Sequence, residues 1–259
     1  YKLDKFSVDG TQDNEKPYSK ALTKELSFYM FYAMDWMSQI NFYNHYINHN
    51  IIYVTGGTGT GKSTQVPKLL MYSLKMYDYK NNGQIICTQP RISPTEGNAK
   101  WISKEMGVQN VRQYLDNEMK TDKYYLQYKD QKDRHTRDNT NHLMLRMATD
   151  GTLFEELLSN PLLKTKVKKP VKDGKEEFMY GLNNKYDIVI VDEAHEHNTN
   201  MDLILTLMKQ TCFYNNSIRL VIVSATMDDD EPIYRNYFKQ INDNLVYPIK
   251  RPLDIHPIL

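Results

Sequence analysis

Cysteine, net charge and long apolar runs are all scarce in this chain of 259 residues. The two cysteines, Cys87 and Cys212, lie far apart in apolar settings. They offer neither a disulfide framework nor the spacing of a zinc site, which fits a reducing compartment. The apolar runs are far shorter than a membrane span, and no stretch has the pattern of a signal peptide. We therefore expect no membrane partner, and a cytoplasmic location or a virion if the protein is viral.

The charge balance limits how the chain could meet a nucleic acid. The net charge is only +1, so a globally basic field is missing. Any nucleic-acid binding must therefore come from a local track of charge. At 40% apolar residues the chain can bury a sizeable core, arranged as one large domain or two small ones.

The most specific motif is the stretch 56–64, GGTGTGKST, which contains the pattern G-x-x-x-x-G-K-[ST]. An apolar run at 51–54 precedes it and a helix-compatible run at 65–77 follows, as in a phosphate-binding loop. Small residues let successive N–H groups turn toward one anion at the positive end of the new helix. Lys62 would reach the terminal phosphates, and the Ser63 hydroxyl would bind Mg²⁺. The alternative is an ordinary glycine-rich turn, against which the Lys-Ser pair and both flanks argue.

Apolar strands alternate with helices along the rest of the chain. Strands are predicted at 51–55, 84–88, 124–128, 143–148, 187–191 and 219–223, and helices at 65–77, 151–159, 200–211 and 232–240. Because the strands are continuously apolar, we expect a mostly parallel sheet with helices on both faces. Ligands bind such sheets at the carboxyl ends of the strands, and every candidate motif here directly follows a strand.

Two segments allow more than one interpretation. The stretch 18–48 is predicted to be helical, after a polar lead-in at 1–17, and its aromatic face could pack on the sheet or stack on bases. Helical spacing without interleaved lysine or arginine favours packing. The lysine-rich insert 164–175, KTKVKKPVKDGK, could touch phosphates, but we predict a solvated, flexible loop.

A pair of acids follows the buried strand at 187–191. Asp192 could hold Mg²⁺, and Glu193 beside it could orient and deprotonate an attacking water. Alternatively, the two acids could complement a helix dipole. Combined with the loop at 56–64, the pair indicates hydrolysis of a nucleoside triphosphate. His195 and His197 form H-x-H, but neither a cysteine nor a third ligand stands nearby to complete a zinc site.

The segments GGTGTGKST, TQPR, TDG, DEAH and SAT, in this order, resemble the first RecA-like domain of superfamily 2 helicases. More narrowly, they resemble the DEAH/RHA group of RNA-dependent ATPases. The stretch VTGGTGTGKSTQVPKLL is also similar to poxviral and giant-virus DEAH-type RNA helicases. The resemblance covers about 50–255. It implies an α/β, RecA-like P-loop NTPase domain at 49–248, an N-terminal helical extension at 1–48 and the start of a linker at 249–259.

The resemblance also assigns roles to residues of the nucleotide site. The phosphates would be bound by Gly57, Thr58, Gly59, Thr60, Gly61, Lys62, Ser63 and Thr64. Lys62 would contact the β and γ oxygens, Ser63 and Asp192 would hold Mg²⁺, and Glu193 would activate water.

Other motif residues would link nucleotide to RNA. His195 would contact a second RecA-like domain and couple hydrolysis to movement, and Ser224 and Thr226 would relay that coupling. The RNA backbone would be held, without reading of its sequence, by residues of TQPR and TDG: Arg91, Thr149 and Asp150.

The chain departs from the family's pattern at two positions. The family usually has a second arginine after TQPR, and here Ile92 stands in its place. Further along, Trp101 falls where the family often places an arginine that stacks on the nucleobase. Trp101 could supply the stacking face, worth about 1–3 kcal/mol, or could be packed in the core.

A larger departure is that nothing in the chain resembles the glutamine–arginine motif of a second RecA-like domain. An arginine finger is worth on the order of 10³–10⁵ in rate. We therefore expect a fragment that binds ATP with Mg²⁺ but hydrolyses it poorly and does not unwind duplexes. The predicted function is the ATP-binding half of an RNA helicase acting on single-stranded RNA, or on duplex RNA with an overhang. A module with a vestigial ATPase and a DNA translocase remain as alternatives.

Overall fold

The computed structural model describes residues 36–78, 80, 82–106, 110–111, 124–129, 143–169, 177–225 and 230–242. The predicted lead-in at 1–17, the first part of the helix at 18–48, Thr226 and the linker at 249–259 lie outside these residues.

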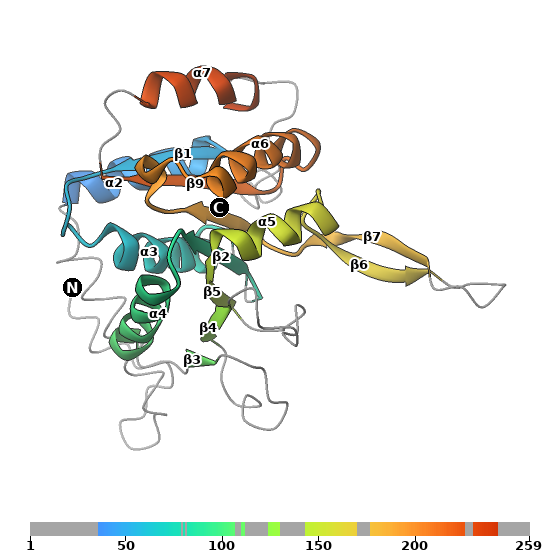
Figure 1. The fold of residues 1–259 in the computed structure, drawn as a ribbon, viewed down its shortest axis with the longest axis horizontal. Coiled ribbons are helices and arrows are strands. Elements are labelled where there is room, and N and C mark those ends of the chain that lie inside the picture. Colours follow the sequence, from blue (N-terminus) through green and yellow to red (C-terminus); the bar gives the residue numbers. More distant parts are fainter. Residues whose placement is uncertain are drawn as a thin grey trace, which may run out of the picture.

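A seven-stranded sheet in the order β1-β9-β8-β2-β5-β4-β3 forms the centre of the fold (Figure 1). Every neighbouring pair of strands in it is parallel. The strands are β1 Ile51–Thr55, β2 Gln84–Gln89, β3 Asn110–Val111, β4 Tyr124–Lys129, β5 Leu143–Thr149, β8 Ile188–Val191 and β9 Arg219–Ser224. The six predicted strands correspond to β1, β2, β4, β5, β8 and β9, so the predicted parallel α/β fold is confirmed. The two-residue strand β3 was not predicted.

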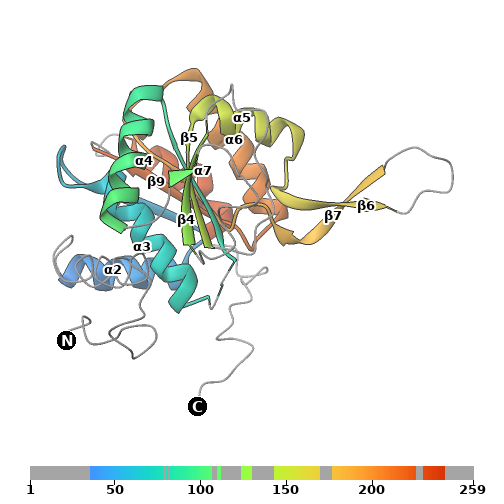
Figure 2. The ribbon, with the colours of Figure 1, turned by 90° about the horizontal axis from the view of Figure 1, so that it is seen from below.

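Helices cover both faces of this sheet, as the continuous apolar strands predict. They are α2 Trp36–Asn48, α3 Lys62–Met76, α4 Ile92–Met106, α5 Asp150–Ser159, α6 Thr199–Tyr214 and α7 Glu231–Asn242. Figure 2 shows α2, α3 and α4 on one side of the sheet and α5 and α6 on the other. The two faces of the sheet each bury an apolar cluster, and alternate residues of β1 contribute to them. Ile52 and Val54 belong to one cluster, and Ile51 belongs to the other. Within the described ranges, no helix has the length and apolar character needed to cross a bilayer.

The described part of the predicted N-terminal helix packs onto the core. α2 buries Phe42 and Tyr46 against α3 and the sheet. Tyr46 also lies under the Arg219 guanidinium, at 4.1 Å from the ring centre, and its hydroxyl donates to Asp78 Oδ2 at 2.5 Å. Phe42 and Tyr46 therefore face the core, whereas the division into an extension at 1–48 and a domain at 49–248 stays a prediction.

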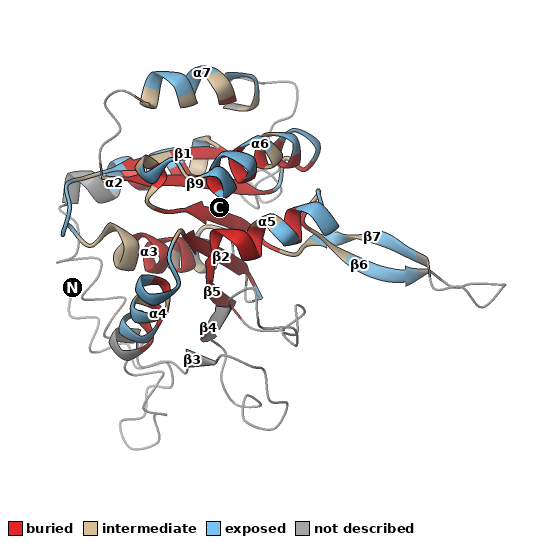
Figure 3. Cartoon of the chain, in the orientation of Figure 1, coloured by how far each residue is buried: buried red, intermediate tan, exposed pale blue. Residues whose placement is uncertain are grey.

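The prediction of a flexible loop at 164–175 is wrong over its first half. β6 Lys164–Lys169 pairs antiparallel with β7 Glu177–Asn184 in a separate two-stranded hairpin. Figure 3 shows this hairpin extending from the core with mostly exposed residues. The high lysine content concealed a period-2 pattern in which lysine alternates with Thr165 and Val167. The second half of the insert lies outside the described residues.

Candidate nucleotide-binding and catalytic site

The parallel strands bring the sequence motifs to one edge of the sheet. In the register of the sheet, Thr55 of β1 lies beside Ser224 of β9, and Gln89 of β2 lies beside Thr149 of β5. Asp192 follows β8, which lies between β9 and β2. The carboxyl edge of the sheet therefore gathers five segments that are far apart in the sequence, as expected for a ligand site in an open parallel sheet.

The loop between β1 and α3 has the backbone shape of an anion cradle. Gly59 and Gly61 both adopt left-handed conformations with φ of 81°, which side chains with a Cβ rarely adopt. Gly61 is the N-cap of α3, and no side chain caps this end of the helix. Thr60 Oγ1 donates to Gly57 O at 2.9 Å and ties the loop to itself. The uncapped first turn of α3 is therefore available to a phosphate.

Lys62 lies across this loop. Its ammonium donates to the carbonyl oxygen of Gly57 at 2.7 Å and also to that of Gly56. A phosphate oxygen in the cradle would be a stronger, charged acceptor for the same ammonium. The predicted position of Lys62 at the phosphates is therefore compatible with the described loop.

Asp192 is buried beside Ser63, with 2% of its surface exposed. Gln89 Nε2 donates to Asp192 Oδ2 at 2.7 Å, and the Glu193 amide donates to Oδ1 at 2.9 Å. Burial raises the pKa of Asp192, although hydrogen bonds from Gln89 and Ser63 and the Lys62 charge lower it in part. A hydroxyl and a carboxylate that adjoin each other are the hard oxygen ligands that Mg²⁺ prefers, so the residues fit this metal.

Glu193 occupies the position next to Asp192 with a left-handed backbone. Its φ of 58° is uncommon for a residue with a Cβ and stores on the order of 1–3 kcal/mol of strain. Burial, followed by the negative charge of Asp192, raises the pKa of the Glu193 carboxyl. A carboxylate with a raised pKa is a better proton acceptor near neutral pH, which suits the predicted general base.

His195 connects this acid to β9. Its Nε2 lies 3.5 Å from Glu193 Oε2, and its Nδ1 lies 3.5 Å from Ser224 Oγ. The Ala225 amide donates weakly to the same Nδ1 at 3.4 Å. His197 instead contacts Asp230 Oδ2 at 2.9 Å, so the two histidines of H-x-H serve different neighbours. Among the described residues, no group of three or more His, Cys, Asp or Glu could hold a metal ion.

A cavity of about 300 Å³ lies where these residues meet. It is lined by Thr58, Gly59, Gly61, Lys62, Ser63, Thr64, Glu193, His195 and Ala225. The phosphate loop, the predicted base and the predicted coupling histidine therefore face one space.

Comparison with known proteins decides the family. The model of the DEAD/DEAH box helicases matches residues 37–233. The chain belongs to this family. A protein of Acanthamoeba polyphaga mimivirus with the name "Putative ATP-dependent RNA helicase R366" is 52% identical over 253 residues, which cover 94% of this chain and 14% of that protein.

More distant relatives carry the same kind of name. The ATP-dependent RNA helicase HrpA of Borreliella burgdorferi is 28% identical over 78% of this chain and 20% of its own length. A protein named as a probable ATP-dependent RNA helicase of Caenorhabditis elegans is 28% identical over 74% of this chain and 21% of its own length. This DEAD/DEAH box chain thus spans 14 to 21% of these three relatives.

The three predicted RNA-binding residues differ in exposure. Arg91 is exposed, and its Nη2 lies 3.2 Å from Glu196 Oε1. Thr149 and Asp150 are buried, with 7% and 3% of their surfaces exposed. Asp150 Oδ2 accepts from Asn198 Nδ2 at 3.0 Å, and Asn198 caps α6. Contact with RNA stays a prediction for all three, and burial favours a positioning role for Asp150.

Trp101 lies on the surface of α4 with 52% of its area exposed, so the alternative of a core tryptophan does not hold. It is not among the residues that line the 300 Å³ cavity, and its stacking on a nucleobase stays a prediction. Sequence reasoning missed the role of Gln89, whose side chain holds Asp192 and accepts from Asn98 Nδ2 at 3.1 Å. Its place in TQPR, at the end of β2, was the available signal.

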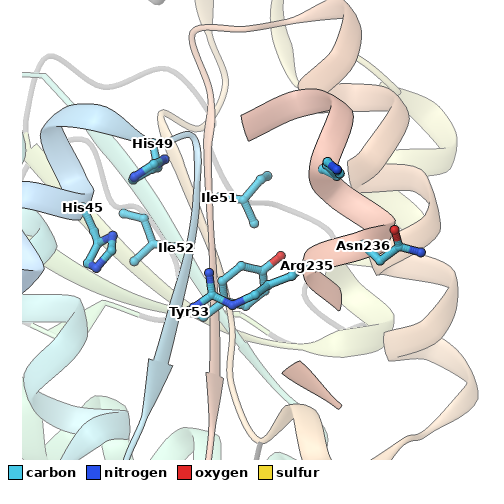
Figure 4. A pocket seen from close by; sticks show the side chains of 8 residues that line it. His45, His49, Ile51, Ile52, Tyr53, Arg235 and Asn236 are labelled. Carbon is cyan, nitrogen blue, oxygen red and sulfur yellow. The ribbon is translucent and has the colours of Figure 1, made fainter. Parts of the chain in front are cut away.

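A second cavity, of about 340 Å³, lies away from these motifs between α2, β1 and α7 (Figure 4). In Figure 4, Arg235 of α7 extends along the ring of Tyr53, and its guanidinium carbon is 5.4 Å from the ring centre. His45 of α2 and His49, which follows the end of α2, stand on the opposite side of β1 in this view. No motif residue of the nucleotide site lines this cavity.

Proposed function

We propose that this chain is the ATP-binding part of an ATP-dependent RNA helicase that moves on single-stranded RNA. The supporting observation is that Lys62, Ser63, Asp192 and Glu193 converge at the carboxyl edge of one sheet. The relatives named as ATP-dependent RNA helicases support the same class of activity.

The nucleotide's phosphates would lie on the uncapped first turn of α3, where backbone N–H groups and the helix dipole favour negative charge. Lys62 would exchange its carbonyl partners for phosphate oxygens. Ser63 and Asp192 would hold Mg²⁺, which neutralises charge that develops on the β and γ phosphates. Gln89 would keep the Asp192 carboxylate in place throughout.

Hydrolysis would use Glu193 as the general base. The attacking water would lose its proton to the Glu193 carboxylate, whose raised pKa suits proton transfer near neutral pH. His195 lies between Glu193 and Ser224, so a shift in position that follows loss of the γ phosphate could be transmitted through His195 to β9. A second RecA-like domain would receive that change and complete the site with arginine fingers.

RNA would contact the same edge of the sheet through its backbone. Arg91 is exposed there and can pair with a phosphate without reading the sequence. We propose a cytoplasmic location, or the virion if the protein is viral, and the mimivirus relative is compatible with this. A module with a vestigial ATPase is less well supported, because Lys62, Ser63, Asp192 and Glu193 are all present.

Steady-state ATP hydrolysis by the full-length protein tests this function. We expect stimulation by single-stranded RNA, and we expect Lys62→Ala and Glu193→Gln each to reduce the rate by about 10²–10⁴-fold. Glu193→Gln should still bind ATP. A rate that RNA does not change would support the vestigial module, and equal stimulation by DNA would support a DNA translocase. The 259-residue chain alone should bind ATP without unwinding a duplex.

A further inference from the structure

The hairpin of β6 and β7 carries a group of exposed apolar side chains that the nucleotide site does not use. Phe178, Met179 and Tyr180 of β7 are exposed at 55%, 53% and 43%, and Val167 of β6 at 49%. Figure 1 shows the hairpin extending beyond α5, and Figure 3 shows pale-blue, exposed residues on both of its strands. Apolar side chains gathered on a protruding element mark a surface that binds something.

The base of this hairpin is fixed to the core. Lys166 Nζ donates to Ser159 O, at the end of α5, at 2.8 Å. Lys185 Nζ lies 3.2 Å from Glu156 Oε2, and Asn184 Nδ2 donates to Ser217 Oγ at 3.0 Å. Because these contacts come from α5 and the segment before β9, the direction of the hairpin is set by the core. The hairpin is therefore a positioned element of the domain.

The strand register sorts the hairpin side chains into two faces. Lys166 pairs with Tyr180, and Lys168 pairs with Phe178, so these four side chains share one face, the lysine–aromatic face. Val167 pairs with Met179 on the opposite side, the aliphatic face. Side chains directly opposite on one face have Cβ atoms about 5 Å apart. Each aromatic ring on the lysine–aromatic face therefore has a lysine stem as its cross-strand neighbour.

The charge of the hairpin departs from that of the chain. Residues 164–185 contain seven lysines and three acidic residues, a net charge of +4, whereas the whole chain has +1. The bulk composition excludes a globally basic surface, so positive charge must be local to attract a polyanion. The hairpin supplies such a local track.

We propose that the lysine–aromatic face binds single-stranded RNA outside the nucleotide site, as a second contact of the helicase. Phe178 and Tyr180 are two residues apart on one strand, so the Cα atoms that carry their rings lie about 7 Å apart. This distance is about twice the axial rise of roughly 3.4 Å per nucleotide in a duplex strand, so it suits the bases of an extended single strand. The rings would stack on bases, and Lys168 would pair with a phosphate. The partner's identity as RNA rests on the proposed function.

A protein partner is the competing occupant. The cores of protein interfaces are depleted of lysine, whereas the exposed rings here have lysines directly opposite. α5 begins at the carboxyl edge and extends about 15 Å before the hairpin begins, so this contact is separate from the Arg91 region. Charge and spacing together favour a nucleic acid over an apolar peptide.

Binding of a labelled oligouridine strand to the full-length protein tests the inference, by fluorescence anisotropy over a range of salt. We expect Phe178→Ala with Tyr180→Ala to weaken binding by about 5- to 100-fold per lost stacked base. Lys168→Gln should reduce the slope of log affinity against log salt by about 0.7. The matched control, Val167→Ala with Met179→Ala, truncates the equally exposed aliphatic face and should bind like the wild type. RNA-independent ATP hydrolysis should stay unchanged in all variants.

Each other outcome overturns the inference. Equal weakening by the aliphatic-face control would show that the hairpin acts through its folding. An unchanged salt slope in Lys168→Gln would show that Lys168 does not contact a phosphate. If the lysine–aromatic variants keep their RNA affinity but lose self-association in sedimentation, the face binds protein instead. If the wild type binds RNA and the lysine–aromatic variants bind equally well, this inference alone fails. If the wild type binds no RNA, the proposed function fails with it.

Discussion

The short strand β8 has an aspartate at each end, and the two differ in how their charge is balanced. Asp187, before the strand, forms an ion pair with Lys80 and accepts from the Gln84 amide at 2.9 Å. Asp192, after the strand, has hydrogen-bond donors but no ion pair within 4 Å among the described residues.

The same difference extends along the two edges of the sheet. At the amino edge, Arg219 Nη1 lies 2.8 Å from Asp78 Oδ2, and both side chains are buried. At the carboxyl edge, burial raises the pKa of Asp150, and Asn198 supplies an uncharged donor. The paired acids of the amino edge hold the fold, whereas we expect Asp192 to receive its cation together with the nucleotide. This reading agrees with a Mg²⁺ site at Asp192.

The largest effect on stability is expected from breaking the amino-edge pair. Arg219→Met would leave the buried Asp78 carboxylate without its cation and should lower the free energy of unfolding by about 3–5 kcal/mol. Urea denaturation measures this change. Addition of Asp78→Asn to the same chain should recover part of the loss, because no buried charge then stays unpaired.

A matched arginine provides the control for that prediction. Arg235 also pairs with a carboxylate, that of Glu231 at 2.5 Å, but 60% of the Arg235 side chain is exposed. Arg235→Met should therefore lower the free energy of unfolding by less than about 1 kcal/mol. Equal losses of unfolding free energy in Arg219→Met and Arg235→Met would show that the buried pair at the amino edge stabilises the fold no more than a surface pair does.

A smaller effect of opposite sign is expected at the carboxyl edge. Burial raises the folded-state pKa of Asp150 above its usual 3.8, so ionisation of this carboxyl in the folded protein reduces stability as pH rises through that pKa. Asp150→Asn should increase the free energy of unfolding at pH 7, by on the order of 1 kcal/mol. The gain should shrink as pH falls toward 3.8, which denaturation at several pH values can follow. A variant that is less stable at pH 7 would show that the charge itself is required.

The sequence predicted those parts of the protein that depend on residues close together in the chain. The phosphate loop carries its own conformational signal in Gly59 and Gly61, and the apolar strands revealed the parallel sheet. Because parallel strands end at one edge, the meeting of the loop with Asp192 and Glu193 followed from their positions after strands.

The parts that were missed depend on pairing between distant residues or on weak local patterns. The sequence predicted a loop at Lys164–Lys169, because its high lysine content was given more weight than its alternation of lysine with Thr165 and Val167. The strand forms by pairing with β7, which follows later in the sequence. The support of Asp192 by Gln89 joins two strands that neighbour each other only in the folded sheet. The hydrogen bond from Asn198 to Asp150 could not be predicted from TDG, because Asn198 is 48 residues away in the sequence, at the start of α6.

We expect the carboxyl edge of the sheet to bind the nucleotide and the amino edge only to hold the fold. Calorimetric titration of the protein with Mg²⁺ and a slowly hydrolysed ATP analogue tests it most directly. Lys62→Ala should weaken binding by at least about tenfold, since it removes a charged hydrogen-bond donor to the phosphates. Tyr46→Phe, which removes a hydroxyl from the amino edge, should bind like the wild type. Wild-type affinity in Lys62→Ala, or an equal loss in Tyr46→Phe, would contradict the account.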